Sequence, residues 1–288
     1  MYVPTIGSED ALVGRAVLDV AITTAATRFG PRLEAAYALG SLAHGGFSSL
    51  VSDVDLGLLL ADPLTAQDAE LIQEVAAHVR DTGEPLTDRL SVFWGSRGSL
   101  MRVGTPGRFP PLDRLDLLLY GRLLYGRDVR SGLPGPTHQD LVDGAARLCL
   151  SLVARHPLTA WACEPTSLLA TGPRSYTKAV LFPVRFLYTA RTGEIGRNHD
   201  AAAHLAEHYP GAAADLAVAA IRWRTQPASP VDAQAVSLIG QGLIPLYRSC
   251  LTAHEALMRS WGDAGLADEL ARACDQVSLG EGEASPAR

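Results

Sequence analysis

Residues 37–60, YALGSLAHGGFSSLVSDVDLGLLL, hold the most informative pattern in the chain. An apolar run leads into Gly40 and Ser41, a small polar loop follows, and a second apolar run carries Asp53 and Asp55. Because side chains alternate along a strand, both carboxylates are expected on one face and their apolar neighbours on the other. The pattern predicts two strands joined by a loop and a short helix, with paired acids on the second strand.

The paired carboxylates of Asp53 and Asp55 indicate a cation site. Two neighbouring carboxylates repel each other, and a hard divalent cation relieves that repulsion. Mg²⁺ is usually bound by one or two carboxylates together with substrate phosphates. Gly40 lets the backbone approach a phosphate closely, and Ser41 can offer its hydroxyl and N–H at a helix N-terminus, where anions are favoured. These residues predict a magnesium–nucleotide site with Asp53 and Asp55 as metal ligands.

Gly40-Ser41, an eleven-residue spacer and Asp53-Val54-Asp55 resemble the signature of the DNA polymerase β-like nucleotidyltransferase superfamily. Ser52 directly precedes the first aspartate, and apolar residues flank both ends of the pattern. The resemblance implies an α/β fold with a small mixed sheet and helices packed on it. It also implies bound Mg²⁺, ATP or another NTP as co-substrate, and nucleotide contacts from the glycine and both serines.

Residues 89–95, RLSVFWG, are expected to form a third strand, and here the sequence departs from the superfamily. Relatives carry a third carboxylate on this strand, which acts as general base toward the incoming hydroxyl or as a further metal ligand. Ser91 occupies the matching position, and a serine cannot take a proton at neutral pH. Asp88 lies three residues earlier, in the opposite phase of a regular strand, and becomes the candidate base if a bulge turns it round. Glu84 is a weaker substitute.

Composition narrows the class of protein. The chain has 288 residues, a net charge of −6 and no basic run. This argues against a polymerase or tRNA-tailing enzyme, which needs a broad positive track for phosphates, so nucleic acid is not expected as a partner. The four cysteines are widely spaced, which favours reduced thiols and a cytoplasmic protein. No segment reaches the roughly 18 apolar residues that a membrane span needs.

Hydrophobic periodicity places the remaining elements. The expected strands are 33–39, 54–60 and 89–95, and the expected helices are 8–29, 65–80, 138–155, 176–192, 200–208 and 231–260. Pro183 predicts a kink or break inside the fourth of these helices. An amphipathic segment over 112–125 closes the first domain, and Asp113 and Asp116 are expected on its solvated face.

A Pro/Gly-rich segment, RSGLPGPT at 130–137, is typical of a linker. We therefore expect a nucleotidyltransferase domain over 1–129, α/β in class, and an all-α helical bundle over 138–277. The last residues, 278–288, are expected to be a disordered tail.

The stretch KAVLFPVRFLYTARTGEIGRNHDAAAHL, residues 178–205, is similar to the helical domain of streptomycin/spectinomycin-type aminoglycoside adenylyltransferases. The match is carried by Thr192-Gly193-Glu194-Ile195 and by Ala201-Ala202-Ala203. The resemblance implies a basic side chain after the turn that contacts nucleotide phosphates, and a tyrosine from the last helical region that contacts the nucleotide. The residues assigned to these roles are Arg197 or His199, with Lys178 in reserve, and Tyr247.

Trp161 and Glu164, in the sequence WACEP, lie in the region where these relatives place substrate-binding aromatics and acids. A cationic aminosugar would be held there by stacking and carboxylate contacts. Packing in a core or between the domains is the alternative for Trp161.

The leading interpretation is a Mg-dependent nucleotidyltransferase that moves a nucleoside monophosphate, AMP from ATP, to a hydroxyl of a small molecule. Aminoglycoside-like antibiotics or metabolites are the expected acceptors, bound in a cleft between the two domains. The alternative is a catalytically degenerate nucleotide-binding or regulatory, antitoxin-like protein that lacks the third carboxylate. A third interpretation is AMPylation of a protein or modification of an RNA 3′-end. Both a monomer and a homodimer remain open.

Overall fold

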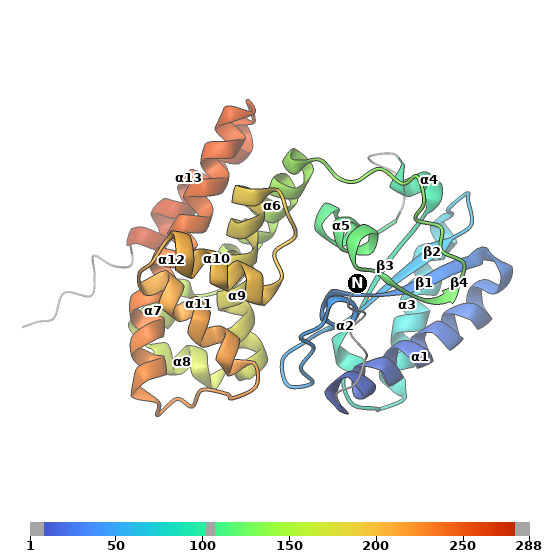
Figure 1. Ribbon diagram of the computed structural model, residues 1–288, viewed down its shortest axis with the longest axis horizontal. Helices are drawn as coiled ribbons and strands as arrows, with labels where there is room; N and C mark the ends of the chain where they lie inside the picture. Colours follow the sequence, from blue (N-terminus) through green and yellow to red (C-terminus); the bar gives the residue numbers. More distant parts are fainter. Residues whose placement is uncertain (1–8, 102–106, 280–288) are drawn as a thin grey trace, which may run out of the picture. The chain divides into compact units, whose positions relative to one another are not determined.

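The computed structural model describes residues 9–101 and 107–279. The chain divides into two compact units, Met1–Pro136 and Thr137–Arg288, and the boundary falls within the Pro/Gly-rich segment (Figure 1). In the described part of the chain, no helix combines the length and the apolar character that a bilayer crossing demands.

The first unit is built on a four-stranded mixed sheet with the strand order β3-β2-β1-β4 (Figure 1). The strands are β1 (Leu33–Leu39), β2 (Val54–Leu60), β3 (Leu90–Ser96) and β4 (Arg122–Gly126). Strand β1 runs antiparallel to β2 and β4, whereas β2 and β3 are parallel. Parallel neighbours need a crossover connection, and helix α3 (Ala66–Asp81) supplies it.

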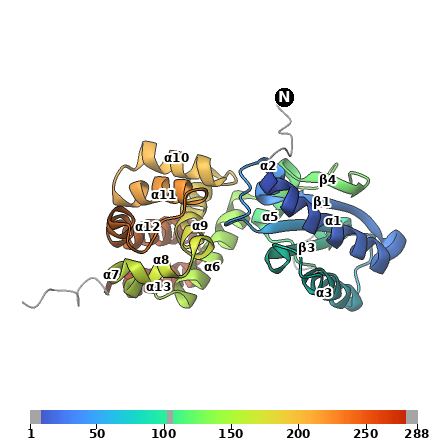
Figure 2. The same cartoon turned by 90° about the horizontal axis from the view of Figure 1, so that it is seen from below.

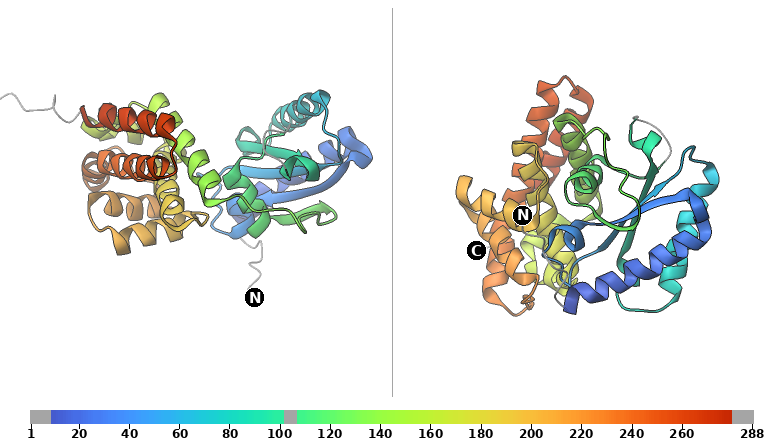
Figure 3. Two further views of the ribbon diagram at one scale, coloured as in Figure 1. Left: turned by 90° about the horizontal axis from the view of Figure 1, so that it is seen from above. Right: turned by 45° about the vertical axis from the view of Figure 1, so that its right-hand side comes forward.

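The two faces of this sheet have different neighbours. One face packs against α3 and α1 (Glu9–Phe29) in a core that includes Val54, Leu56 and Leu58 of β2. The other face carries a smaller cluster that includes Leu59 and, from α5 (Pro111–Leu119), Leu117. Figure 3 shows α5 on the side of the sheet opposite α1 and α3. Since side chains alternate, the odd-numbered residues of β2, among them Asp55, face the α5 side.

The remaining elements of the first unit are short. They are the 3₁₀ turns η1 (Gly30–Arg32) and η2 (Thr87–Arg89) and the helices α2 (Gly40–His44) and α4 (Arg97–Leu100). The segment 112–125 splits into α5 and β4, and the fourth strand was not expected. Gly121 marks the break, because a Cβ there would lie 2.5 Å from the Leu117 carbonyl oxygen. After that break the chain can pair with the free side of β1.

The second unit is built of helices (Figure 2). They are α6 (His138–Arg155), α7 (Leu158–Cys163), α8 (Pro165–Ala170), α9 (Pro173–Thr192), α10 (Asn198–His208), α11 (Ala212–Trp223), α12 (Ala233–Ser260) and α13 (Ala264–Leu279). Pro183 lies inside α9 and does not end it. Of the expected tail, residues 278 and 279 belong to α13, and the rest lies outside the described residues.

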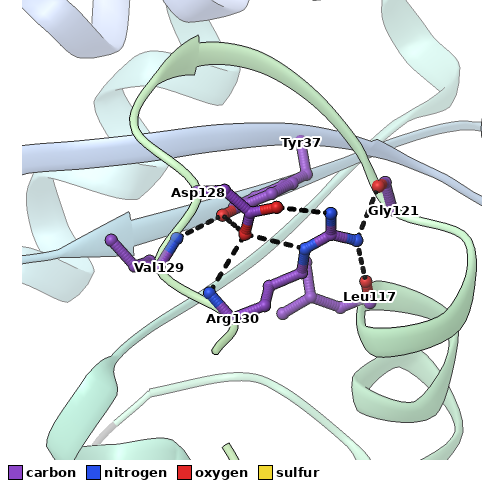
Figure 4. Close-up of polar contacts among 6 residues, drawn as sticks. All are labelled: Tyr37, Leu117, Gly121, Asp128, Val129 and Arg130. Carbon is purple, nitrogen blue, oxygen red and sulfur yellow. Dashed lines mark hydrogen bonds and ion pairs between the residues drawn. The ribbon is translucent and has the colours of Figure 1, made fainter. Parts of the chain in front are cut away.

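Tyr37, Asp128 and Arg130 tie the end of β4 back onto β1 and α5 (Figure 4). The Tyr37 hydroxyl donates to Asp128 Oδ1 at 3.1 Å and accepts from the Val129 N–H at 3.0 Å. Arg130 donates to both Asp128 oxygens, at 2.9 and 2.6 Å, and to the carbonyls of Leu117 and Gly121, at 3.0 and 2.8 Å. One guanidinium thus joins Asp128 to the last turn of α5 and to the residue that precedes β4.

This closing network should make stability pH-dependent. Hydrogen bonds from Arg130 hold the pKa of the Asp128 carboxyl well below its usual range, so its stabilising effect is present above the unfolded pKa of about 4 and is lost as pH falls. Burial raises the pKa of Tyr37 to about 12. Its contribution is therefore present below the unfolded pKa of about 10 and disappears as pH rises through 12.

We expect Asp128→Asn to lower the free energy of unfolding at pH 7, by an amount that shrinks as pH falls from about 5 toward 2. Urea denaturation of both proteins across this range measures the difference. Asp143→Asn is the control, since Asp143 and Arg147 form an exposed ion pair and such pairs contribute little. A pH-independent difference between wild type and Asp128→Asn would contradict this account.

Candidate functional site

The Gly-Ser turn and the second carboxylate are in direct contact. Strand β1 ends at Leu39, which is paired with Asp55 in the antiparallel register. Gly40 then opens α2 with a φ of +58°, and a Cβ at this position would collide with Oδ2 of Asp55. Glycine is required here for two reasons: the backbone is in the left-handed region, and the Asp55 carboxylate leaves no room for a Cβ. The structure therefore brings together two residues, Gly40 and Asp55, that the sequence pattern assigns to one site.

Asp53 lies two residues ahead of Asp55, directly before β2, and both side chains are partly exposed. Two carboxylates in the same strand phase offer hard oxygen donors, which suit Mg²⁺ when phosphates complete its shell. In residues 9–101 and 107–279, no set of three or more His, Cys, Asp or Glu side chains is arranged to hold a metal ion. Two carboxylates alone do not complete the coordination shell of Mg²⁺, so an ion bound here would need further oxygen ligands such as phosphates.

The two serines of the motif occupy different surroundings. Ser41 is the second residue of α2 and is partly exposed. Ser52 is buried, its hydroxyl accepts the Ser48 N–H at 3.0 Å, and its own N–H donates to the Ser48 carbonyl at 2.8 Å. Ser41 is therefore accessible to solvent, whereas Ser52 holds the loop between α2 and β2.

Ser91 stands beside Asp55, its partner in the parallel register of β2 and β3. The seven paired positions of these strands run without a register shift, so no bulge in the paired part of β3 turns Asp88 toward the carboxylate pair. Asp88 lies in η2, ahead of the strand, and is exposed, as is Glu84. The position next to Asp55 thus belongs to a serine, as expected from the place of Ser91 on the third strand.

Asp116 of α5 is the residue that sequence reasoning misplaced. It was expected on a solvated face, but it is only 5% exposed, and its Oδ2 accepts the Gly40 N–H at 2.6 Å. His44, the last residue of α2, places Nε2 3.9 Å from Asp116 Oδ1 and packs edge-on against Tyr120. Amphipathic spacing could not reveal this, because the partner Gly40 lies far away in the sequence.

Two residues assigned to ligands pack inside the helical unit. Tyr247 is fully buried in α12, and its hydroxyl donates to the Ala179 carbonyl at 2.9 Å. Trp161 is 9% exposed, and the centroid of its ring lies 5.0 Å from the centroid of the His156 ring. Both side chains serve the core in this structure, so the site proposed below does not include them. Glu164 is exposed where α7 gives way to α8.

The basic candidates of the helical unit are accessible. Lys178 in α9 is partly exposed, with its ammonium 5.6 Å from the centre of the Phe182 ring. Arg197 pairs with Asp200 at 2.5 Å, and His199 is exposed in the first turn of α10. Their contact with a nucleotide stays a prediction.

No protein-family model matches the chain, and no curated protein matches it. Among solved structures, the chain is similar to spectinomycin adenyltransferase AAD(9) from Enterococcus faecialis, crystallised with ATP and spectinomycin, with a TM-score of 0.60 and 14% sequence identity. The likeness covers 82% of this chain and 98% of that one. It confirms the predicted fold, a nucleotidyltransferase α/β unit followed by helices.

Proposed function

We propose that the protein is a magnesium-dependent nucleotidyltransferase that moves a nucleoside monophosphate, AMP from ATP, to a hydroxyl of a small molecule. The contact between Gly40 and the Asp55 carboxylate, at the end of two paired strands, carries the proposal. The fold likeness to an adenyltransferase solved with ATP and spectinomycin supports it. An aminoglycoside-like antibiotic or a related metabolite is the class of acceptor we propose.

Each motif residue has a role in this proposal. Asp53 and Asp55 would hold Mg²⁺, which, when bound with the triphosphate, lowers charge repulsion and stabilises the leaving pyrophosphate. Ser41 binds phosphate oxygens through its hydroxyl and N–H at the start of α2. Gly40 lets the backbone come close to the phosphates but does not donate a hydrogen bond to them, because its N–H already donates to Asp116.

A catalytically silent nucleotide-binding protein is the second candidate, and Ser91 is the observation that favours it. A carboxylate beside Asp55 would accept the proton of the acceptor hydroxyl, and the serine there cannot do so at neutral pH. In the enzyme, the proton must therefore pass to water or to a group that the acceptor brings.

A pyrophosphate-release screen tests the proposal. The protein is incubated with Mg²⁺, each of the four NTPs, and a panel of aminoglycosides, lincosamides and nucleosides. We expect release with ATP that depends on one class of acceptor. Mg·ATP binding by calorimetry without release would support the silent nucleotide-binding protein. The absence of both binding and release would contradict a nucleotide site altogether.

Ser91→Glu should raise the turnover of this transfer by about ten- to a hundredfold. The new carboxylate would stand beside Asp55 and act as general base, an effect usually worth about 10²–10⁴ in rate. Ser91→Gln is the matched control, since it has the same length but cannot take a proton. Steady-state kinetics of the three proteins measure the effect, and an equal rise in both variants would count against a missing base.

A further inference from the structure

Asp116 accepts the first N–H of helix α2. The first N–H of α2 belongs to Gly40, and the N-cap residue Leu39 offers no side-chain hydrogen bond. The carboxylate of Asp116 accepts this N–H from a different helix, α5. A charged group from elsewhere in the unit thus completes the turn that we assign to phosphate binding.

The burial of the Asp116 carboxylate costs free energy. A buried carboxylate is unfavourable without good partners. Asp116 has one short hydrogen bond, from Gly40, and its Oδ1 has no hydrogen-bond partner among the described residues. His44 stands 3.9 Å from that oxygen. One hydrogen bond offsets only part of the cost of burying this carboxylate. We therefore infer that Asp116 serves to position the Gly40 peptide group and not to stabilise the fold.

The support of Asp116 is rigid. Leu117, the next residue, is fully buried against the sheet, and its carbonyl accepts a hydrogen bond from Arg130. The closing network of Figure 4 therefore fixes the helix turn that presents the carboxylate. Because its carboxylate is held in place, Asp116 can fix the direction in which the Gly40 N–H points.

Gly40 is such a flexible group. Glycine adopts positive and negative φ with similar ease, so its backbone alone does not select +58°. The hydrogen bond to Asp116 on one side and the Asp55 carboxylate on the other restrict it. Ser41 follows directly, so the direction of its N–H depends on how Gly40 is held.

We propose that Asp116 is a positioning residue of the nucleotide site: it anchors the Gly40 N–H and so aims Ser41 at the phosphates beside Asp53 and Asp55. The inference rests on the proposed function. It assigns the third acid of the site to α5, whereas the superfamily motif would place it on β3. The role of this acid is to orient the turn and not to take a proton.

Two substitutions separate the hydrogen bond from the charge. Asp116→Ala removes the acceptor, and Asp116→Asn keeps an oxygen that can accept the Gly40 N–H. We expect the alanine variant to bind Mg·ATP about ten- to a hundredfold more weakly, the range that loss of a charged hydrogen bond allows. The asparagine variant should stay within about threefold of wild type. Asp113→Ala, on the same helix, is the control.

Calorimetry with Mg·ATP gives the affinities, and thermal unfolding without ligand shows that each variant is folded. In the transfer assay, the KM for ATP should rise in Asp116→Ala while the KM for the acceptor stays unchanged. Amide hydrogen exchange of Gly40 in the ligand-free protein reports directly on the hydrogen bond between the Gly40 N–H and Asp116. Exchange should be slow in wild type and Asp116→Asn and fast in Asp116→Ala.

Each result has a distinct meaning. Wild type that binds no Mg-NTP overturns the proposed function and this inference with it. Normal binding by wild type and by folded Asp116→Ala overturns the inference alone. An asparagine variant as weak as the alanine variant, but with Gly40 exchange as slow as in wild type, would show that the charge and not the hydrogen bond is needed, and this also overturns it.

Discussion

Asp55→Asn is expected to abolish the proposed metal-dependent nucleotide transfer, and Asp53→Asn is expected to do the same. Each substitution keeps the side-chain shape and removes one of the two negative charges that we propose hold Mg²⁺ at the start of β2. Because the metal supplies several kcal/mol of charge stabilisation in phosphoryl transfer, we expect kcat/KM to fall by about a thousandfold or more, roughly 4 kcal/mol. The fold should be unaffected, since both side chains are partly exposed.

Calorimetry with ATP, in the presence of Mg²⁺ and after its removal with a chelator, measures this effect. Wild type should bind ATP tightly only with metal, and the Asp55→Asn protein should bind weakly under both conditions. Asp81→Asn, at the exposed end of α3, serves as the charge-matched control. Tight, metal-dependent binding by Asp55→Asn would remove the basis of the proposed function.

Gly40→Ala should damage the site almost as severely. A φ of +58° costs an alanine roughly 1–2 kcal/mol, and its Cβ would push against the Asp55 carboxylate. That carboxylate must move for the side chain to fit, so the proposed metal ligand is displaced together with the turn. We expect a loss of about a hundredfold or more in Mg·ATP affinity, which is roughly 3 kcal/mol.

Gly45→Ala is the matched control for Gly40→Ala. Gly45 also has a positive φ, +91°, but a Cβ there meets no other atom within 4 Å. Both variants therefore carry a backbone penalty, and only Gly40→Ala has the collision. Urea denaturation should show a loss of stability in both, while calorimetry should show a binding defect in Gly40→Ala alone. Equal nucleotide affinities would contradict the assigned role of the contact between Gly40 and Asp55.

Local sequence patterns were sufficient for the centre of the first unit. Strands β1 and β2 have the predicted bounds, and β3 is shifted by one residue. The apolar runs that form them are bounded by glycine, proline and acidic residues, so pattern and turn chemistry agree. The segment 112–125 offered no such agreement, because short apolar runs are compatible with helix and strand. Its division at Gly121 follows from pairing with β1 and from contacts with Arg130.

Site residues that depend on distant contacts were beyond the reach of the sequence. Gly40, Asp55 and Ser91 could be brought together from the sequence, because they lie in or next to paired strands whose register places them side by side. Asp116 is buried only because α5 folds back over the Gly-Ser turn, 76 positions earlier in the chain. The burial of Tyr247 likewise depends on the packing of α12 against α9, which a motif match does not describe.

The closing network of Figure 4 draws its residues from Tyr37 to Arg130, all ahead of the boundary at Pro136. The α/β unit is therefore closed by its own side chains, ahead of the helical unit. Recombination or protein engineering that joins it to another helical partner beyond Pro136 should leave Gly40, Asp55 and Asp116 in place.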